Sequence, residues 1–238
     1  MKIHQLLKTA AMLALGIHLN AEASEVSCGP LKIPNKHGPY DYRTATPAEL
    51  NLVERAHFTP AVEALIKPMF RDFGPDLGYT LWAFPNHHRA LVALINLTEK
   101  EKSSQPVGLP YPAECYFERA IRYKADDNIV RMLYANFLVL QKRKGDAITE
   151  LNYVENKVQD NPLSHYNLAQ LYMDAGNFNK ARIHAKLSLE LGWPKTDIKE
   201  RLESLGQWAD PLSATSAATA GGSAAPAAPV VSPTPASR

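Results

Sequence analysis

The run Asn86-His87-His88-Arg89 places two imidazoles beside a guanidinium, a set of groups that could hold a metal ion, an anion or a polar partner. The spacing disfavours a metal ion. Adjacent helical residues point about 100° apart, whereas two ligands of one ion need positions i and i+3 or i+4. His57 is distant in the sequence and could act as a further ligand only if the fold brought it close to this run. We therefore predict no metal and no cofactor, and we interpret Asn86 as a residue whose hydrogen bonds begin a helix.

The chain contains two cysteines, Cys28 and Cys115. Residues 1–23 carry two lysines, then an apolar run from Thr9 to Leu19, then a small-x-small pattern that ends at Ala23. This pattern is typical of a secretory signal peptide, so we predict cleavage near Ala23 and a periplasmic or secreted protein. Because such a protein matures in an oxidising compartment, we predict a disulfide between the two cysteines.

Enzymatic chemistry has little support in the sequence. We find no glycine-rich phosphate loop, no Gly-x-Ser-x-Gly nucleophile motif and no metalloprotease box. An active site would have to lie near Asp41, Glu49, Glu54 and His57, whose spacing matches no catalytic arrangement. We therefore predict a protein that is not an enzyme, with no catalytic residue.

The charges are nearly balanced, with 26 Lys and Arg against 24 Asp and Glu and a formal net charge of +2. This balance argues against a nucleic-acid partner, which usually requires a strongly basic domain. Beyond the predicted signal peptide no apolar run reaches the roughly 18 residues that a membrane span needs, so we predict no span in the mature chain.

The elements that would position these groups are helices. In the middle of the chain, these helices follow a repeated sequence pattern. Tyr134-Ala135 aligns with Leu168-Ala169, and Ala147 aligns with Ala181, both at an offset of 34 residues. The later unit resembles a tetratricopeptide repeat (TPR) unit. The positions that carry this resemblance are Leu168, Ala169, Tyr172, Gly176, Phe178, Ala181, Ala185, Leu189 and Pro194.

The resemblance weakens toward the N-terminus. Residues 128–161 form a degenerate unit. A first unit begins near Asn86 and contains an insertion that we place in a long loop from Glu101 to Tyr111.

Further helices are predicted from local signals in the sequence. Their signals are the capping box Thr46-Pro47-Ala48-Glu49, the start Thr59-Pro60 with Val62, Ile66 and Phe70 on one face, the cap Asp126-Asp127, the cap Asn161-Pro162, and the stripe Ile198, Leu202 and Leu205.

We therefore predict an all-α fold: a short TPR-like helical-hairpin solenoid with an N-terminal helical extension and a C-terminal capping helix. The signal peptide would cover 1–23, an extended segment and N-terminal helices 24–79, and the solenoid 80–208. Residues 209–238 are rich in Ala, Pro and Ser, and we predict a disordered tail there.

The resemblance to TPR proteins implies an adaptor that binds a protein or peptide partner along one helical face. Transferring the repeat positions predicts a partner-binding groove, with the N-terminal segment as an alternative occupant of it. The predicted groove residues are His87, Met132, Asn136, Val139, Tyr166, Gln170 and Met173. We expect a role in a cell-envelope assembly such as polysaccharide export, pilus biogenesis or secretion. An alternative hypothesis is a periplasmic protein that binds a metal or small ligand through His57, His87, His88, Arg89, Tyr79 and Trp82.

Overall fold

The computed structural model describes residues 28–32 and 37–209, which form ten helices and no strand, so the predicted all-α fold is confirmed for this part of the chain. The predicted signal peptide and all of the predicted tail after Ala209 lie outside the described residues. The helices are α1 (Pro47–His57), α2 (Pro60–Glu63), α3 (Phe73–Ala83), α4 (His88–Glu101), α5 (Ala113–Tyr123), α6 (Asn128–Leu140), α7 (Lys144–Glu155), α8 (Pro162–Asp174), α9 (Phe178–Glu190) and α10 (Asp197–Ser204).

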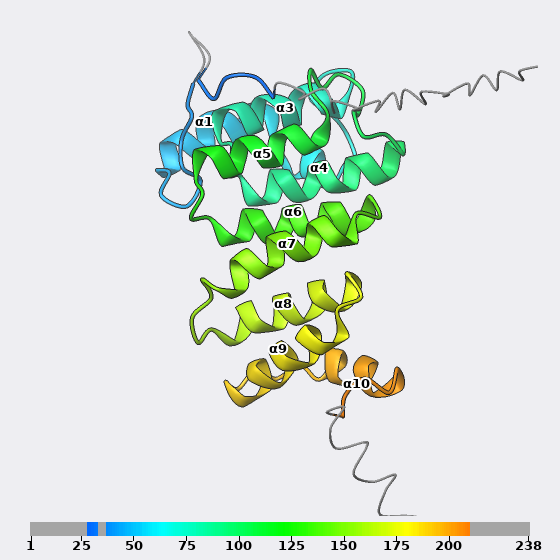
Figure 1. Cartoon of the computed structure of the whole chain (residues 1–238). Helices are drawn as coiled ribbons and strands as arrows, with labels where there is room; N and C mark the ends of the chain where they lie inside the picture. The colour runs from blue at the N-terminus through cyan, green and yellow to red at the C-terminus, as the bar shows by residue number, and fades with distance from the viewer. Residues whose placement is uncertain (1–27, 33–36, 210–238) are drawn as a thin grey trace, which may run out of the picture.

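The helices are layered in chain order, from α1 and α3 at the top of Figure 1 to α10 at the bottom. Three antiparallel pairs, α4–α5, α6–α7 and α8–α9, make up most of the molecule. The first helices of the pairs contact one another in the order α4, α6, α8, and each second helix also contacts the first helix of the next pair. The helices from α2 to α10 therefore share one continuous core, and Val53 of α1 packs with Ala83 and Phe84 in a second, smaller cluster.

Small residues set the close packing within the pairs. Ala135 and Ala169, in the first helices of their pairs, and Ala147 and Ala181, in the second, are all fully buried. An alanine at the crossing point lets two helix backbones approach closely, and the same two positions recur 34 residues apart. The alanines that repeat every 34 residues in the sequence are thus buried in the core of the structure.

The N-terminal helices follow the predicted caps in part. Thr46 and Glu49 form the predicted capping box at the start of α1. Thr59 caps α2 as predicted, but α2 ends at Glu63, and the prediction that Val62, Ile66 and Phe70 lie on one face of this helix is wrong. Val62 is buried, whereas the chain leaves the helix before Ile66 and Phe70, which are exposed.

At the other end of the molecule, α10 packs against α9 and covers the last pair. Its Ile198 and Leu202 are buried, as the predicted stripe requires, but Leu205 is exposed because it lies just after the helix ends. The long loop predicted from Glu101 to Tyr111 is present, since α4 ends at Glu101 and α5 begins at Ala113.

The predicted disulfide joins Cys28 to Cys115 on α5. The guanidinium of Arg119, also on α5, is buried over the ring of Trp82 and donates hydrogen bonds to the carbonyls of Cys28 and Pro30. Residues 28–30 are therefore fixed on α5 by a covalent bond and by hydrogen bonds from the Arg119 side chain to their backbone carbonyls. Among the described residues, no helix is long and apolar enough to cross a membrane.

Candidate functional site

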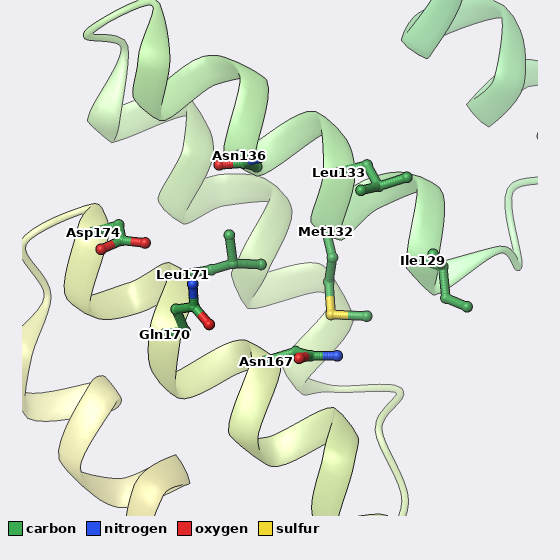
Figure 2. Close-up of a pocket in the computed structure, with 8 residues that line it drawn as sticks. All are labelled: Ile129, Met132, Leu133, Asn136, Asn167, Gln170, Leu171 and Asp174. Carbon is green, nitrogen blue, oxygen red and sulfur yellow. The ribbon is translucent and has the colours of Figure 1, made fainter. Parts of the chain in front are cut away.

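A groove lies between α6 and α8, with a cavity volume of about 310 Å³. Figure 2 shows side chains from both helices around the same space. Each helix contributes residues at positions i, i+3, i+4 and i+7, which is one continuous stripe of an α-helix. The lining residues are Ile129, Met132, Leu133 and Asn136 from α6, and Asn167, Gln170, Leu171 and Asp174 from α8.

A second hollow of about 380 Å³ continues this surface toward α4. It shares Ile129 and Leu133 with the groove, and Val92, Ala93 and Asn96 of α4 form its opposite side. The first helices of the three pairs therefore present one extended surface that begins at α4 and ends at α8.

The groove combines apolar and amide side chains. Ile129 is 46% exposed, and it lies beside the partly buried Leu133 and Leu171 on the same surface. Asn136, Asn167 and Gln170 each carry both a donor and an acceptor, the two groups that a peptide backbone offers. Asp174 is the one charged residue among the eight, and its carboxylate lies 3.6 Å from the guanidinium of Arg201.

The structure brings together three of the predicted groove residues, Met132, Asn136 and Gln170. Tyr166 and Met173 are buried instead, and neither they nor Val139 line the groove. The hydroxyl of Tyr166 donates to Asp197 at 2.9 Å. It lies one residue before Asn167, and that step of about 100° turns it away from the groove toward α10.

His87 is not in the groove, which corrects the prediction for this residue. It is fully buried, and its Nδ1 accepts a hydrogen bond from the backbone N–H of Ala90, so that His87 caps α4. Its ring stacks on Tyr42 at 4.1 Å, and its Nε2 lies 3.0 Å from a carboxylate oxygen of Glu54. The physical reason for the difference is that the residue before the helix points into the core, not along the helical face.

The protonation state of His87 follows from these contacts. Burial, together with the charge of Arg89, lowers the pKa of His87 to about 3, so the ring is neutral near pH 7. Because Nδ1 accepts a hydrogen bond from the N–H of Ala90, the ring hydrogen is on Nε2 and is donated to Glu54. His87 is therefore a helix cap with a fixed tautomer.

Asn86 does not cap the helix, so that prediction is wrong and the cap lies one residue later, at His87. Its side-chain amide donates to Asp41 at 2.7 Å and to Asp127 at 2.9 Å, and its carbonyl oxygen accepts from the backbone N–H of Tyr42 at 3.0 Å. The predicted cap is thus a bridge between the N-terminal segment, the start of α4 and the start of α6. His88 joins the same bridge through its Nε2, 2.9 Å from Asp127.

The side chains of the metal or small-ligand hypothesis do not meet at one site. His57 stacks on Tyr79 at 4.1 Å and lies 3.4 Å from Asp76, Arg89 pairs with Glu63, and Trp82 covers Arg119. Within residues 28–32 and 37–209, no group of three or more His, Cys, Asp or Glu side chains is arranged to hold a metal ion.

The carboxylates considered for catalysis have structural partners. Asp41 accepts hydrogen bonds from Arg43, whose charge and hydrogen bonds lower the pKa of Asp41 well below its usual range. Glu49 belongs to the capping box, and Glu54 accepts from His87. These contacts give each of the three a role in the fold.

Sequence reasoning missed several groove residues, among them Asn167, Leu171 and Asp174. The signal was present in the sequence, because these residues form one helical stripe with Gln170.

No protein-family model, curated protein or solved structure matches this chain. The groove, the repeat and the disulfide are therefore the observations from which a function is inferred.

Proposed function

We propose that the protein is an exported, non-enzymatic adaptor with a TPR-like helical-hairpin solenoid, which binds a protein or peptide partner in a cell-envelope assembly. Polysaccharide export, pilus biogenesis and secretion are the systems to which such an adaptor would belong. The observation that carries the proposal is the groove between α6 and α8, where the exposed Ile129 and the partly buried Leu133 and Leu171 lie beside three amide side chains.

The arrangement of the helices supports a solenoid. The 34-residue period, the paired alanines and the contacts of α4 with α6 and of α6 with α8 are what stacked helical hairpins require. The disulfide supports export, because disulfides persist in oxidising compartments.

The chemistry of the groove favours an extended peptide segment as the partner. Asn136, Asn167 and Gln170 can each exchange hydrogen bonds with a peptide backbone, while Ile129, Leu133 and Leu171 bury apolar side chains of the segment. No Lys or Arg is among the eight lining residues, so the groove offers no cation for a terminal carboxylate. We infer that the partner contributes an internal segment of its chain.

The described N-terminal segment leaves the groove to this partner. Arg122 donates to the carbonyl of Gly29, and Tyr123 donates to that of Pro39, so both ends of the segment lie against α5. All eight lining residues belong to α6 and α8. Partner binding therefore does not require the described residues of this segment, 28–32 and 37–39, to move.

A photo-crosslinking group at position 133, with the same group at position 183 of α9 as a reference, would identify the partner in the exporting cell. The affinity of that partner for Ile129→Asp is then compared with its affinity for Ile183→Asp. The two isoleucines have similar exposure, 46% and 44%, but only Ile129 lines the groove.

We expect Ile129→Asp to weaken binding at least tenfold, because a carboxylate would be buried against apolar side chains of the partner, and Ile183→Asp to leave binding unchanged. Equal affinities for both variants, or a crosslink at position 183 alone, would contradict the proposal. Circular dichroism of both variants shows that the helices are intact.

A further inference from the structure

An exposed apolar turn connects α2 to α3. In residues 66–71, here called the 66–71 loop, three large apolar side chains face the solvent: Ile66 is 78% exposed, Phe70 65% and Met69 47%. Elsewhere in the described part of the chain, exposed large apolar residues either belong to the groove surface or are separated in sequence. Isolated exposed apolar residues are ordinary, but three within five residues mark an interaction surface.

The loop is held in this exposed conformation by the core. Both oxygens of the buried carboxylate of Asp76 are engaged: one accepts from the backbone N–H of Met69 at 2.8 Å, and the other lies 3.4 Å from Nδ1 of His57. The ammonium group of Lys100 donates to the carbonyl of Leu65 at 2.7 Å, where the backbone has a left-handed φ of 52°. The apolar side chains are thus presented by a fixed backbone.

The charges around the apolar side chains are mainly positive. Lys67 is exposed and forms no ion pair with any described residue, and the side chain of Arg71 is 93% exposed, 3.7 Å from Asp72. Of the nearby acids, Asp76 is buried in the contacts just described and Glu63 is paired with Arg89. Two exposed cations, Lys67 and Arg71, therefore lie in the same loop as the apolar residues, and Asp72 lies next to Arg71.

We propose that the 66–71 loop binds the surface of a membrane that contains anionic phospholipids. Ile66, Met69 and Phe70 would enter the boundary between headgroups and acyl chains, while Lys67 and Arg71 would contact the lipid phosphates. A short exposed turn that carries three apolar side chains and two cations suits a lipid interface better than a protein partner, which would need a broader surface. This inference is independent of the groove and adds a membrane-surface contact to the proposed adaptor.

The test uses the full chain. Because the apolar run from Thr9 to Leu19 could itself bind lipid, total binding to vesicles is not sufficient, and the fluorescence signal must come from the 66–71 loop. Phe70→Trp adds a fluorophore in the loop, and Ile183→Trp adds one on α9 as a control. Because the chain already contains three tryptophans, the signal of each added tryptophan is the difference between the variant and the natural chain in the same vesicles. Each variant is mixed with vesicles of phosphatidylcholine alone or of phosphatidylcholine and phosphatidylglycerol in equal amounts. Acyl chains that carry bromine serve as contact quenchers.

We expect the added tryptophan at position 70 to shift to shorter wavelength and to be quenched by the bromolipid in anionic vesicles, and the one at position 183 to be unaffected. Adding Ile66→Ser to Phe70→Trp should weaken this response at least tenfold, since one large apolar side chain is removed from the interface. Adding Lys67→Gln and Arg71→Gln should abolish the preference for anionic vesicles. The melting temperatures should stay unchanged, because these side chains are exposed.

The proposal is overturned if the tryptophan at position 70 shows no response to anionic vesicles, or if its response to neutral vesicles is equal. It is also overturned if its emission shifts without lipid as protein concentration rises, because the loop would then bind a second copy of the chain. These results are distinct from those of the groove experiment, which uses positions 129, 133 and 183.

Discussion

At the scale of single residues, His87 shows how burial decides the role of a reactive side chain. Its ring is surrounded by Tyr42, Phe58 and Phe84, and its two nitrogens are used by Ala90 and Glu54. The residue type and its place before a helix are visible in the sequence. The aromatic shell is not, because Tyr42 and Phe58 come from positions far from it in the chain.

The low pKa of His87 predicts an acid-sensitive stability. The unfolded chain binds a proton at this residue near pH 6.5 and the folded chain only near pH 3, so acid favours the unfolded state between these values. Replacing His87 with Asn, which also caps helices, removes this proton uptake. We expect the loss of unfolding free energy between about pH 7.5 and about pH 5 to be about 2 kcal/mol smaller in the variant.

Urea unfolding at the two pH values, followed by circular dichroism, measures this difference. The variant should keep some acid dependence, because burial also lowers the pKa values of His165 and His184. Their Nδ1 atoms lie 2.9 Å apart, and Nε2 of His184 lies 3.2 Å from Glu155. If His87→Asn and the natural chain lost equal free energy on acidification, His87 would not be the neutral cap described above.

At the scale of elements, Asp127 joins three parts of the chain at the start of α6. Its buried carboxylate caps α6 by accepting from the backbone N–H groups of Ile129 and Val130, and it also contacts Asn86 and His88. Burial alone would raise the pKa of Asp127, but the hydrogen bonds from His88 and Asn86 outweigh it and the pKa is lowered. The first turns of α4 and α6 are thereby tied together.

Removing this carboxylate should be costly. We expect Asp127→Ala to lower the free energy of unfolding by about 3 kcal/mol, because the cap is lost and the donors of Asn86 and His88 are left without their acceptor. Asp126→Ala is the matched control. Asp126 is the neighbouring residue, but its side chain is 72% exposed and pairs with Arg43. Chemical unfolding of both variants tests the prediction, and a similar loss in the two would contradict it.

Helix starts could be predicted because their signals are local. Thr46 with Glu49, Asp127, and Asn161 before Pro162 are each read within four residues, and all three cap helices. The end of α2 could not be predicted. The apolar spacing of Val62 and Ile66 continues a helical pattern, but a left-handed residue and the distant Lys100 fix a turn between them.

The groove illustrates the same limit. The helical repeat located Met132, Asn136 and Gln170, and the same spacing would also give Leu133 and Leu171. It could not show that Tyr166 is covered, because the covering residues, Trp193 and Asp197, follow after a further helix. Which side of a helix stays open depends on what packs against it later in the chain.

At the scale of the whole molecule, the disulfide between Cys28 and Cys115 closes a loop with a sequence separation of 87 residues. In the chain-entropy relation, a loop of this length stabilises the folded state by about 4 to 5 kcal/mol, because it restricts the unfolded chain. We expect reductant to lower the urea midpoint of the natural chain accordingly. The double variant Cys28→Ser, Cys115→Ser should start from that lower midpoint and show no further change, whereas an unchanged midpoint in the reduced natural chain would contradict the prediction.

The path of the N-terminal segment also has a consequence for the order of assembly. Residues 28–32 lie far before their binding surface on α5, which includes Cys115, Arg119 and Arg122; Cys28 and Cys115 are separated by 87 residues. The pair α8–α9, in contrast, is formed by neighbouring stretches of chain and needs no distant partner to close. Residues 28–32 can therefore be fixed only after the chain up to α5 has reached the compartment in which the disulfide forms.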